Sequence, residues 1–211
     1  MERLTSILFG AGVFCFALAG VITGYLPIAH LSKIGYKKLD QIAPEPSEEF
    51  RQLAQKYPDT FKKYYGEPNT ENFHKALRKG RDVYIAEACW HCHSQFTRPV
   101  SNEDMRFGKV SWSGEYMNEM FMPHLFGTRR VGPDLIRESG RHSNDWHVAH
   151  FYDPTSVVPT SVMPRFSWFF DGEQPNDKGI AVITYMQWLG SWATPESLAQ
   201  SMKKEKAHVA H

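Results

Sequence analysis

Two cysteines and two histidines lie within residues 89–93, whose sequence is Cys-Trp-His-Cys-His. Close cysteine pairs occur in zinc sites, in redox-active dithiols and in sites of covalent haem attachment. These chemistries require different residues elsewhere in the chain, so the rest of the sequence can distinguish them. The third cysteine, Cys15, lies far away in an apolar run, and three cysteines do not make a disulfide-rich scaffold.

The first two chemistries find little support elsewhere in the sequence. A structural zinc site takes four protein ligands, usually as two Cys/His pairs a dozen or more residues apart. The chain has no second cysteine pair, and His142, His147 and His150 would be an unusual complement to a lone Cys-x-x-Cys. A thioredoxin-like dithiol follows a strand in a βαβ pattern, and no strand-rich pattern precedes Cys89.

The third chemistry fits the motif, because Cys-x-x-Cys-His is the attachment sequence for c-type haem. Two thiols three residues apart on a helical turn, here Cys89 and Cys92, can reach the two vinyl groups on one porphyrin edge. The histidine that follows projects over the ring centre, so we expect His93 to bind the iron. We expect His91, between the cysteines, to be a surface or packing residue.

Haem iron of this type commonly takes a methionine as its second axial ligand, and the thioether raises the reduction potential. Met163 is the best candidate, because Pro159 and Pro164 stiffen the apolar segment that carries it. The alternative is a methionine that fills a gap in the core. Four other methionines are candidates only if Met163 fails: Met105, Met117, Met120 and Met122.

The outer ring nitrogen of a ligating histidine needs a hydrogen-bond acceptor. The segment Arg-Val-Gly-Pro-Asp-Leu at 130–135 suits this role, because its Gly-Pro turn presents a rigid carbonyl at Pro133. It resembles the Gly-Pro-x-Leu sequence that does this in c-type cytochromes. Arg129 and Arg130 are then candidate partners of the haem propionates, and solvated surface arginines are the alternative.

The N-terminal region predicts a membrane anchor. Residues 7–26 carry no charge, and about 20 apolar residues span roughly 30 Å, the thickness of the hydrocarbon core. The rival interpretation is a cleaved signal peptide ending at the Ala-Leu-Ala of 17–19, but the apolar run is longer than a signal sequence needs. Lysines at 33, 37 and 38 weakly favour a cytoplasmic C-terminal domain.

The remaining chain predicts a mainly α protein with a class I-like cytochrome c domain and long loops. We expect an anchor over 1–32, a helical stalk or insertion over 33–79, the haem domain over 80–193 and a polar tail over 194–211. Within the haem domain, 98–133 reads as mostly loop and 176–189 as a helix. Gly80 and Tyr84, with Tyr185 and Leu189, resemble the residues at which the first and last helices of cytochrome c cross. The resemblance implies that these two pairs meet in the haem domain.

Composition agrees with a buried cofactor and excludes one class of partner. The formal net charge is +1 and the pI is about 7.8, so no basic field argues for nucleic acid. Aromatic residues make up 14% of the chain and include six tryptophans, which exceeds what a core of this size usually needs. Burying a large flat cofactor is one use for that surplus.

Three stretches together resemble a narrower family, the membrane-anchored monohaem subunit of cbb3-type cytochrome c oxidases. They are GRDVYIAEACWHCHSQFTRP at 80–99, TRRVGPDL at 128–135 and GRHSNDWHVAHFYDPTSVVPTSVMPRFSWFF at 140–170. The resemblance covers roughly 80–190 and the anchor. The segment before the haem motif is longer here, and Ser167-Trp168 replaces the family's Pro-Trp; neither change touches the haem site.

The resemblance implies one covalent haem c, with Cys89 and Cys92 as the thioether residues and His93 and Met163 as axial ligands. It implies an electron relay to a large haem-copper oxidase subunit, so oxygen chemistry would occur in that partner. A further cytochrome c subunit or donor cytochrome and membrane lipid are the other expected partners. Because haem is attached to such proteins outside the bacterial cytoplasm, the haem domain should be periplasmic on a single-pass inner-membrane protein. The resemblance also implies that His147 and His150 pack or form hydrogen bonds against the haem loop.

Two alternatives stay open. The small subunit of a nitric oxide reductase shares the layout of an anchor and a haem domain, although the Ser-Gln and Asp-Trp-His stretches argue against it. A free-standing anchored electron shuttle or haem sensor would use the same attachment chemistry. A permanent complex predicts an extensive apolar contact surface, whereas a shuttle predicts a small exposed patch at the haem edge.

Overall fold

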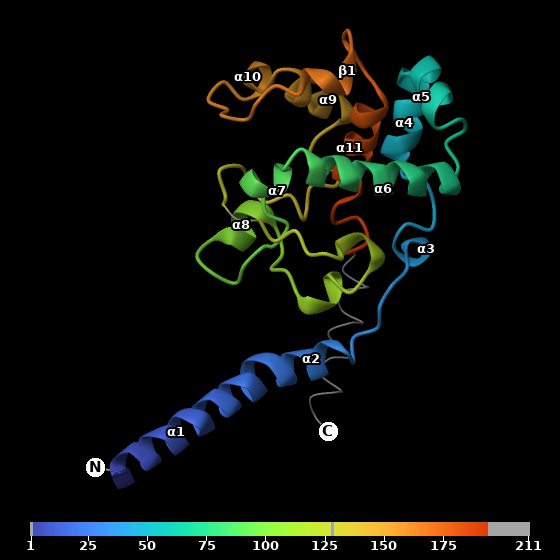
Figure 1. The fold of residues 1–211 in the computed structure, drawn as a ribbon. Helices are drawn as coiled ribbons and strands as arrows, with labels where there is room; N and C mark the ends of the chain where they lie inside the picture. The colour runs from blue at the N-terminus through green and yellow to red at the C-terminus, as the bar shows by residue number, and fades with distance from the viewer. Residues whose placement is uncertain (1, 128, 194–211) are drawn as a thin grey trace. The chain divides into compact units, whose positions relative to one another are not determined.

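The computed structural model describes residues 2–127 and 129–193, which form two compact units, 2–36 and 37–193 (Figure 1). The described chain is mainly helical and contains only two short strands, as the sequence predicts. The predicted polar tail, 194–211, lies outside the described residues.

The first unit is a single helical rod of three consecutive pieces. They are α1 (Glu2–Gly20), the π-helical turn η1 (Val21–Tyr25) and α2 (Leu26–Leu31). Pro27 has no N–H to donate, and a local π adjustment is a common response of a helix to proline. The rod has a mean hydropathy of 2.2 over its most apolar window and buries none of that window. In the described chain it is the one helix long and apolar enough to cross a membrane, as expected of a single-pass anchor.

Two crossing helices, α6 (Thr70–Ala86) and α11 (Asp177–Trp188), form the centre of the second unit. They approach closely because Gly80 has no side chain: a Cβ there would lie 2.1 Å from the carbonyl oxygen of Ala181 and 2.7 Å from the Cβ of Tyr185. Beside this contact the rings of Tyr84 and Tyr185 meet edge to face, with centroids 5.7 Å apart. The predicted helix crossing is confirmed.

Three short helices before α6 share this core: α3 (Leu39–Ile42), α4 (Glu48–Lys56) and α5 (Pro58–Tyr64). Ser47 caps α4, because its Oγ accepts a hydrogen bond from the backbone N–H of Phe50 at 3.2 Å. The ring of Phe50 then packs against Phe61 and Phe73, with centroids 4.9 and 5.1 Å away. The segment expected to be a helical stalk or insertion therefore contains helices α3, α4 and α5, and their aromatic residues are covered by the same unit that contains α11.

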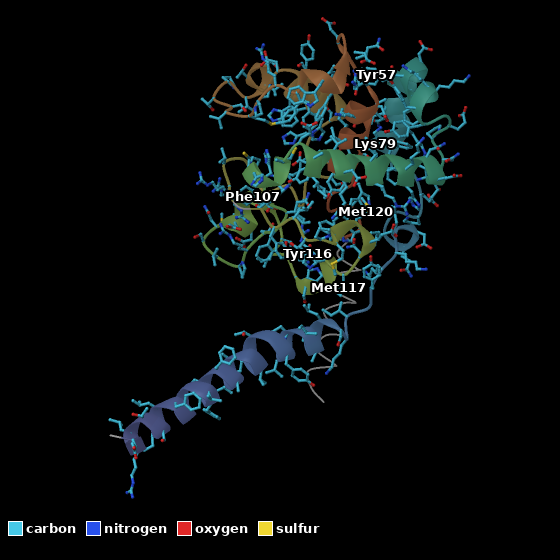
Figure 2. The ribbon with its side chains drawn as sticks, viewed as in Figure 1. Tyr57, Lys79, Phe107, Tyr116, Met117 and Met120 are labelled. Carbon is cyan, nitrogen blue, oxygen red and sulfur yellow. The ribbon has the colours of Figure 1, made fainter. Side chains whose placement is uncertain are left out.

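Between α6 and α9 the chain is mostly irregular, as predicted for 98–133. Its short helical pieces are α7 (Cys89–Cys92), α8 (Glu103–Phe107), η2 (Ser113–Glu115) and η3 (Glu119–Phe121). Tyr116, Met117 and Met120 lie on the loop after α8 (Figure 2). This loop folds inwards through Tyr116, Met120 and Phe121, all of which are buried. An isolated bridge between Lys37 and Asn118 fastens the start of the second unit to the same loop.

The last part of the unit carries the segment around Met163. Its elements are α9 (Asn144–Tyr152), α10 (Pro154–Val157), η4 (Ser167–Phe169), β1 (Phe170–Asp171), β2 (Gln174–Pro175) and then α11. The two strands pair antiparallel in a small hairpin, with Phe170 opposite Pro175. In Figure 1, α7 lies between α8 on one side and α9 with α10 on the other. The two predicted ligand segments therefore belong to different parts of the unit.

Candidate haem-attachment site

The cysteine pair lies on a single helical turn that is separated from α6 by a sharp bend. Ala88 produces the bend by adopting a left-handed conformation, with φ 56° and ψ 28°. This conformation costs a non-glycine residue about 1–2 kcal/mol, and such strain tends to occur at functional sites. After the bend, the one turn of α7 carries Cys89, which is half-buried, and Cys92, which is exposed.

Both cysteines are free thiols, and so is Cys15. Burial raises the pKa of the Cys89 thiol to about 12, whereas a dithiol that attacks disulfides needs a lowered thiol pKa. The environment of Cys89 therefore does not suit a redox-active dithiol. Among the described residues, no group of three His, Cys, Asp or Glu side chains is placed to hold a metal ion.

His93 is oriented by the Gly-Pro turn. Its Nδ1–H donates a hydrogen bond of 2.9 Å to the carbonyl oxygen of Pro133, since a carbonyl can only accept. The other ring nitrogen, Nε2, then carries the lone pair that a metal ligand needs. Burial lowers the pKa of His93, which favours this neutral form. The hydrogen bond predicted from the sequence is present.

Gly132 makes this arrangement possible. A Cβ at Gly132 would lie 2.2 Å from Cε1 and 2.6 Å from Nδ1 of His93, which is closer than atoms can approach. The backbone N–H of Gly132 also donates a 2.9 Å hydrogen bond to the carbonyl of Cys92. The turn is thus packed directly against the ring and the attachment motif, and only glycine fits there.

Asp134, the next residue after this turn, is a site residue that the sequence analysis missed. Its side chain is fully buried, and it accepts hydrogen bonds from the Ser94 hydroxyl at 2.5 Å and the Phe96 N–H at 2.7 Å. Its second oxygen accepts from the Ile136 N–H at 2.9 Å. The available signal was an acidic residue inside an otherwise apolar turn, which calls for buried donors nearby.

The two predicted propionate partners lie in different environments. Arg129 is exposed, whereas Arg130 is largely buried and pairs with Glu103. The Nε of Arg130 also donates to the Ser94 hydroxyl at 2.7 Å, and its guanidinium bonds to the Phe96 carbonyl. The structure thus assigns Arg130 to protein partners; contact of either arginine with a propionate stays a prediction.

Met163 is half-buried on the connection between α10 and η4 and packs against the core. Its backbone N–H bonds to the hydroxyl of Ser161 at 3.2 Å, and a 3.0 Å bond from the Phe166 N–H to the Phe151 carbonyl fastens the connection to α9. Of the alternatives, Met120 is enclosed in the core and Met105 is 85% exposed. Ligation by Met163 stays a prediction.

The other histidines near the motif are packing residues. His91 is exposed and stacks on Trp90, with ring centroids 3.9 Å apart, as expected for a residue that points outwards. On α9, His150 stacks on Trp146 with centroids 4.4 Å apart. Burial lowers the pKa of His150 to about 4. Burial lowers the pKa of His147 to about 3.

The geometry of the cysteine turn and His93 agrees with a match to a known family. The family model described as the cytochrome c oxidase mono-haem subunit FixO matches residues 63–211, which is more than half of the chain. The chain belongs to the FixO family. Comparison with functionally curated proteins returns no match. The resemblance inferred from the three sequence stretches is thereby confirmed.

Membership of the FixO family makes this chain a mono-haem subunit of a cytochrome c oxidase, which implies one haem and other oxidase subunits as partners. The residues fit that group. Two free thiols lie on one turn, a neutral imidazole has one nitrogen engaged and the other available, and Gly132 leaves room for the ring. All of these residues, and Met163, lie inside the matched range.

Proposed function

We propose that this protein is a membrane-anchored c-type cytochrome that relays electrons to the haem-copper catalytic subunit of a cbb3-type cytochrome c oxidase. Cys89 and Cys92 would hold one haem c covalently, and His93 and Met163 would bind its iron. When bound, the haem would supply one-electron chemistry between Fe(III) and Fe(II). The observation that supports this most strongly is the pairing of the cysteine turn with the His93–Pro133 hydrogen bond.

The chain's own residues would set how readily the iron gives up its electron. The Pro133 carbonyl fixes the orientation of His93 and increases its basicity, which favours Fe(III). A thioether ligand such as Met163 favours Fe(II) and raises the potential. These two opposing contributions would come from separate segments, 132–134 and 158–166. No substrate bond would be made or broken in this subunit.

The topology follows from the same chemistry. The helix Glu2–Leu31 would anchor the protein in the bacterial inner membrane as a single pass. Haem c is attached outside the cytoplasm, so residues 37–193 would lie in the periplasm. The lysines after the anchor favour the opposite orientation only weakly, and the attachment chemistry outweighs them. A second cytochrome c subunit or a soluble donor cytochrome would supply the electrons.

Purification of the native complex in mild detergent tests this proposal. Full-length protein should co-purify with a large multi-helix haem-copper subunit, and the complex should consume oxygen when given a reduced donor. A chain with Cys89→Ser and Cys92→Ser is the matched control. Serine has nearly the same size as cysteine, but it has no thiol through which haem can be attached. If the complex consumes mainly nitric oxide, the proposed oxidase is wrong and the chain is instead a subunit of a nitric oxide reductase. A lone haem protein with neither partner nor activity would leave only an anchored carrier.

A further inference from the structure

Two segments run side by side at the candidate site, 92–96 after the cysteine turn and 130–136 around the Gly-Pro turn. Their backbones are joined by hydrogen bonds from Gly132 N–H to the Cys92 carbonyl and from Leu135 N–H to the Ser94 carbonyl, each 2.9 Å long. The bond from His93 to the Pro133 carbonyl lies between these two. The position of the Pro133 carbonyl therefore depends on how firmly the two segments are held together.

Asp134 bonds to both segments with one carboxylate. One oxygen, Oδ2, accepts from Ser94 and Phe96 on the first segment, and the other, Oδ1, accepts from Ile136 on the second. The group is 0% exposed, and Arg130 lies 3.6 Å from Oδ2 and also bonds to Ser94. A buried carboxylate is stable only when its oxygens are fully used in this way.

We propose that Asp134 is a positioning residue for His93: it clamps segment 92–96 to segment 130–136 and so fixes the length and direction of the hydrogen bond from His93 to the Pro133 carbonyl. This inference rests on the proposed haem function, because the bond matters through the ligand it orients. Asp134 itself contacts neither the imidazole ring nor a cofactor. Its effect would reach the iron through the neighbouring carbonyl.

The consequence is a control on the electron affinity of the haem. A strong hydrogen bond from Nδ1–H increases the electron donation of the imidazole and stabilises Fe(III). When the clamp is loosened, the Pro133 carbonyl is free to move, the bond weakens and the reduction potential rises. Loss of the buried negative charge would also raise the potential, so the test must separate charge from geometry.

Three variants of the full-length, haem-loaded protein make that separation. Asp134→Asn keeps the shape but turns an NH₂ group towards N–H donors that need an acceptor. Ser94→Ala removes one hydrogen bond to Asp134 and the one that Ser94 accepts from Arg130, and it leaves the charge of Asp134 unchanged. Glu115→Gln is the matched control: Glu115 is a buried carboxylate held by Arg137 at 2.6 and 2.8 Å, and it bonds to neither clamped segment.

The decisive measurement is solvent exchange of the His93 ring N–H proton, followed by NMR in the reduced, diamagnetic protein. Because weakening one hydrogen bond makes its N–H easier to exchange, we expect roughly tenfold faster exchange in Asp134→Asn and a smaller acceleration in Ser94→Ala. Glu115→Gln should stay within about twofold of wild type. The reduction potential should rise in Ser94→Ala as well, although no charge is lost.

The proposal is overturned if Asp134→Asn and Ser94→Ala both exchange at the wild-type rate, or if Glu115→Gln accelerates exchange as much as Asp134→Asn. If Asp134→Asn fails to accumulate, the His93 N–H exchange rates of Ser94→Ala and Glu115→Gln are compared, and that comparison decides the question. The wild-type protein separates this test from the proposed function. Absence of covalent haem in wild type would contradict the function, whereas wild-type haem with unchanged variants would contradict only the clamp.

Discussion

Replacing Gly80 by alanine should push the two central helices apart. A Cβ at this position would lie 2.1 Å from the Ala181 carbonyl oxygen and 2.7 Å from the Cβ of Tyr185. Both atoms belong to the rigid part of α11, so rotation of a side chain cannot relieve the contact. Reaching an acceptable separation requires α6 and α11 to move apart by about 1 Å.

The size of the effect follows from that displacement. A gap of 0.5–1 Å removes about a quarter to a half of the dispersion energy of each contact across it, and overpacked cores lose about 1–3 kcal/mol. Alanine regains about 1 kcal/mol over glycine through its helix propensity. Because the new Cβ would lie only 2.1 Å from a backbone oxygen, the overpacking loss should be at the upper end of this range, about 3 kcal/mol. After the gain in helix propensity, we expect a net loss of about 2 kcal/mol in the free energy of unfolding. For a unit of this size that lowers the Tm by about 4–8 °C.

Thermal unfolding of the detergent-solubilised protein, followed by circular dichroism, measures this loss. Gly12→Ala is the matched control, because Gly12 is also helical and a Cβ there meets nothing within 4 Å. The control should leave the unfolding of the second unit unchanged. If Gly80→Ala is as stable as wild type or more stable, the close approach of α6 and α11 is wrong.

Three further substitutions test the site. Gly132→Ala places a Cβ 2.2 Å from the ring of His93, so covalent haem content should fall several-fold when measured by the pyridine haemochrome spectrum. Met163→Leu should lower the reduction potential and let carbon monoxide bind the reduced iron; an unchanged spectrum would exclude Met163 as a ligand. His147 has a pKa of about 3 in the folded protein, below its unfolded value, so stability should fall as the pH drops from about 6.5 towards 3. The loss should approach about 1.4 kcal/mol per pH unit, and His147→Gln should flatten that slope in denaturant titrations.

The features of the site that could be predicted are those encoded in short, continuous stretches of the sequence. The motif around Cys89 specifies its own spacing, and the Gly-Pro turn predicts an exposed carbonyl that His93 can use, as the 2.9 Å bond shows. The crossing at Gly80 was also predicted, because Gly80, Tyr84, Tyr185 and Leu189 resemble the residues at the helix crossing of cytochrome c. The length of the apolar run at the N-terminus is enough to predict a membrane-spanning helix.

The missed parts depend on contacts between distant segments. A sequence gives the charge of Arg130 but not its partner, and Glu103 was not foreseen because the loop between them has no periodicity. The role of Asp134 is likewise set by Ser94 and Phe96, 40 and 38 residues away. The left-handed conformation of Ala88 could not be predicted, since glycine or asparagine is the usual residue in that conformation.

The most direct test of the central claim is the covalent haem content of the full-length protein made in cells that mature c-type cytochromes. The intact mass and the pyridine haemochrome spectrum after denaturation should show one haem per chain. The variant with Cys89→Ala and Cys92→Ala should carry none that survives denaturation. A wild-type chain without covalent haem, or with haem that is retained when both cysteines are absent, would contradict the account.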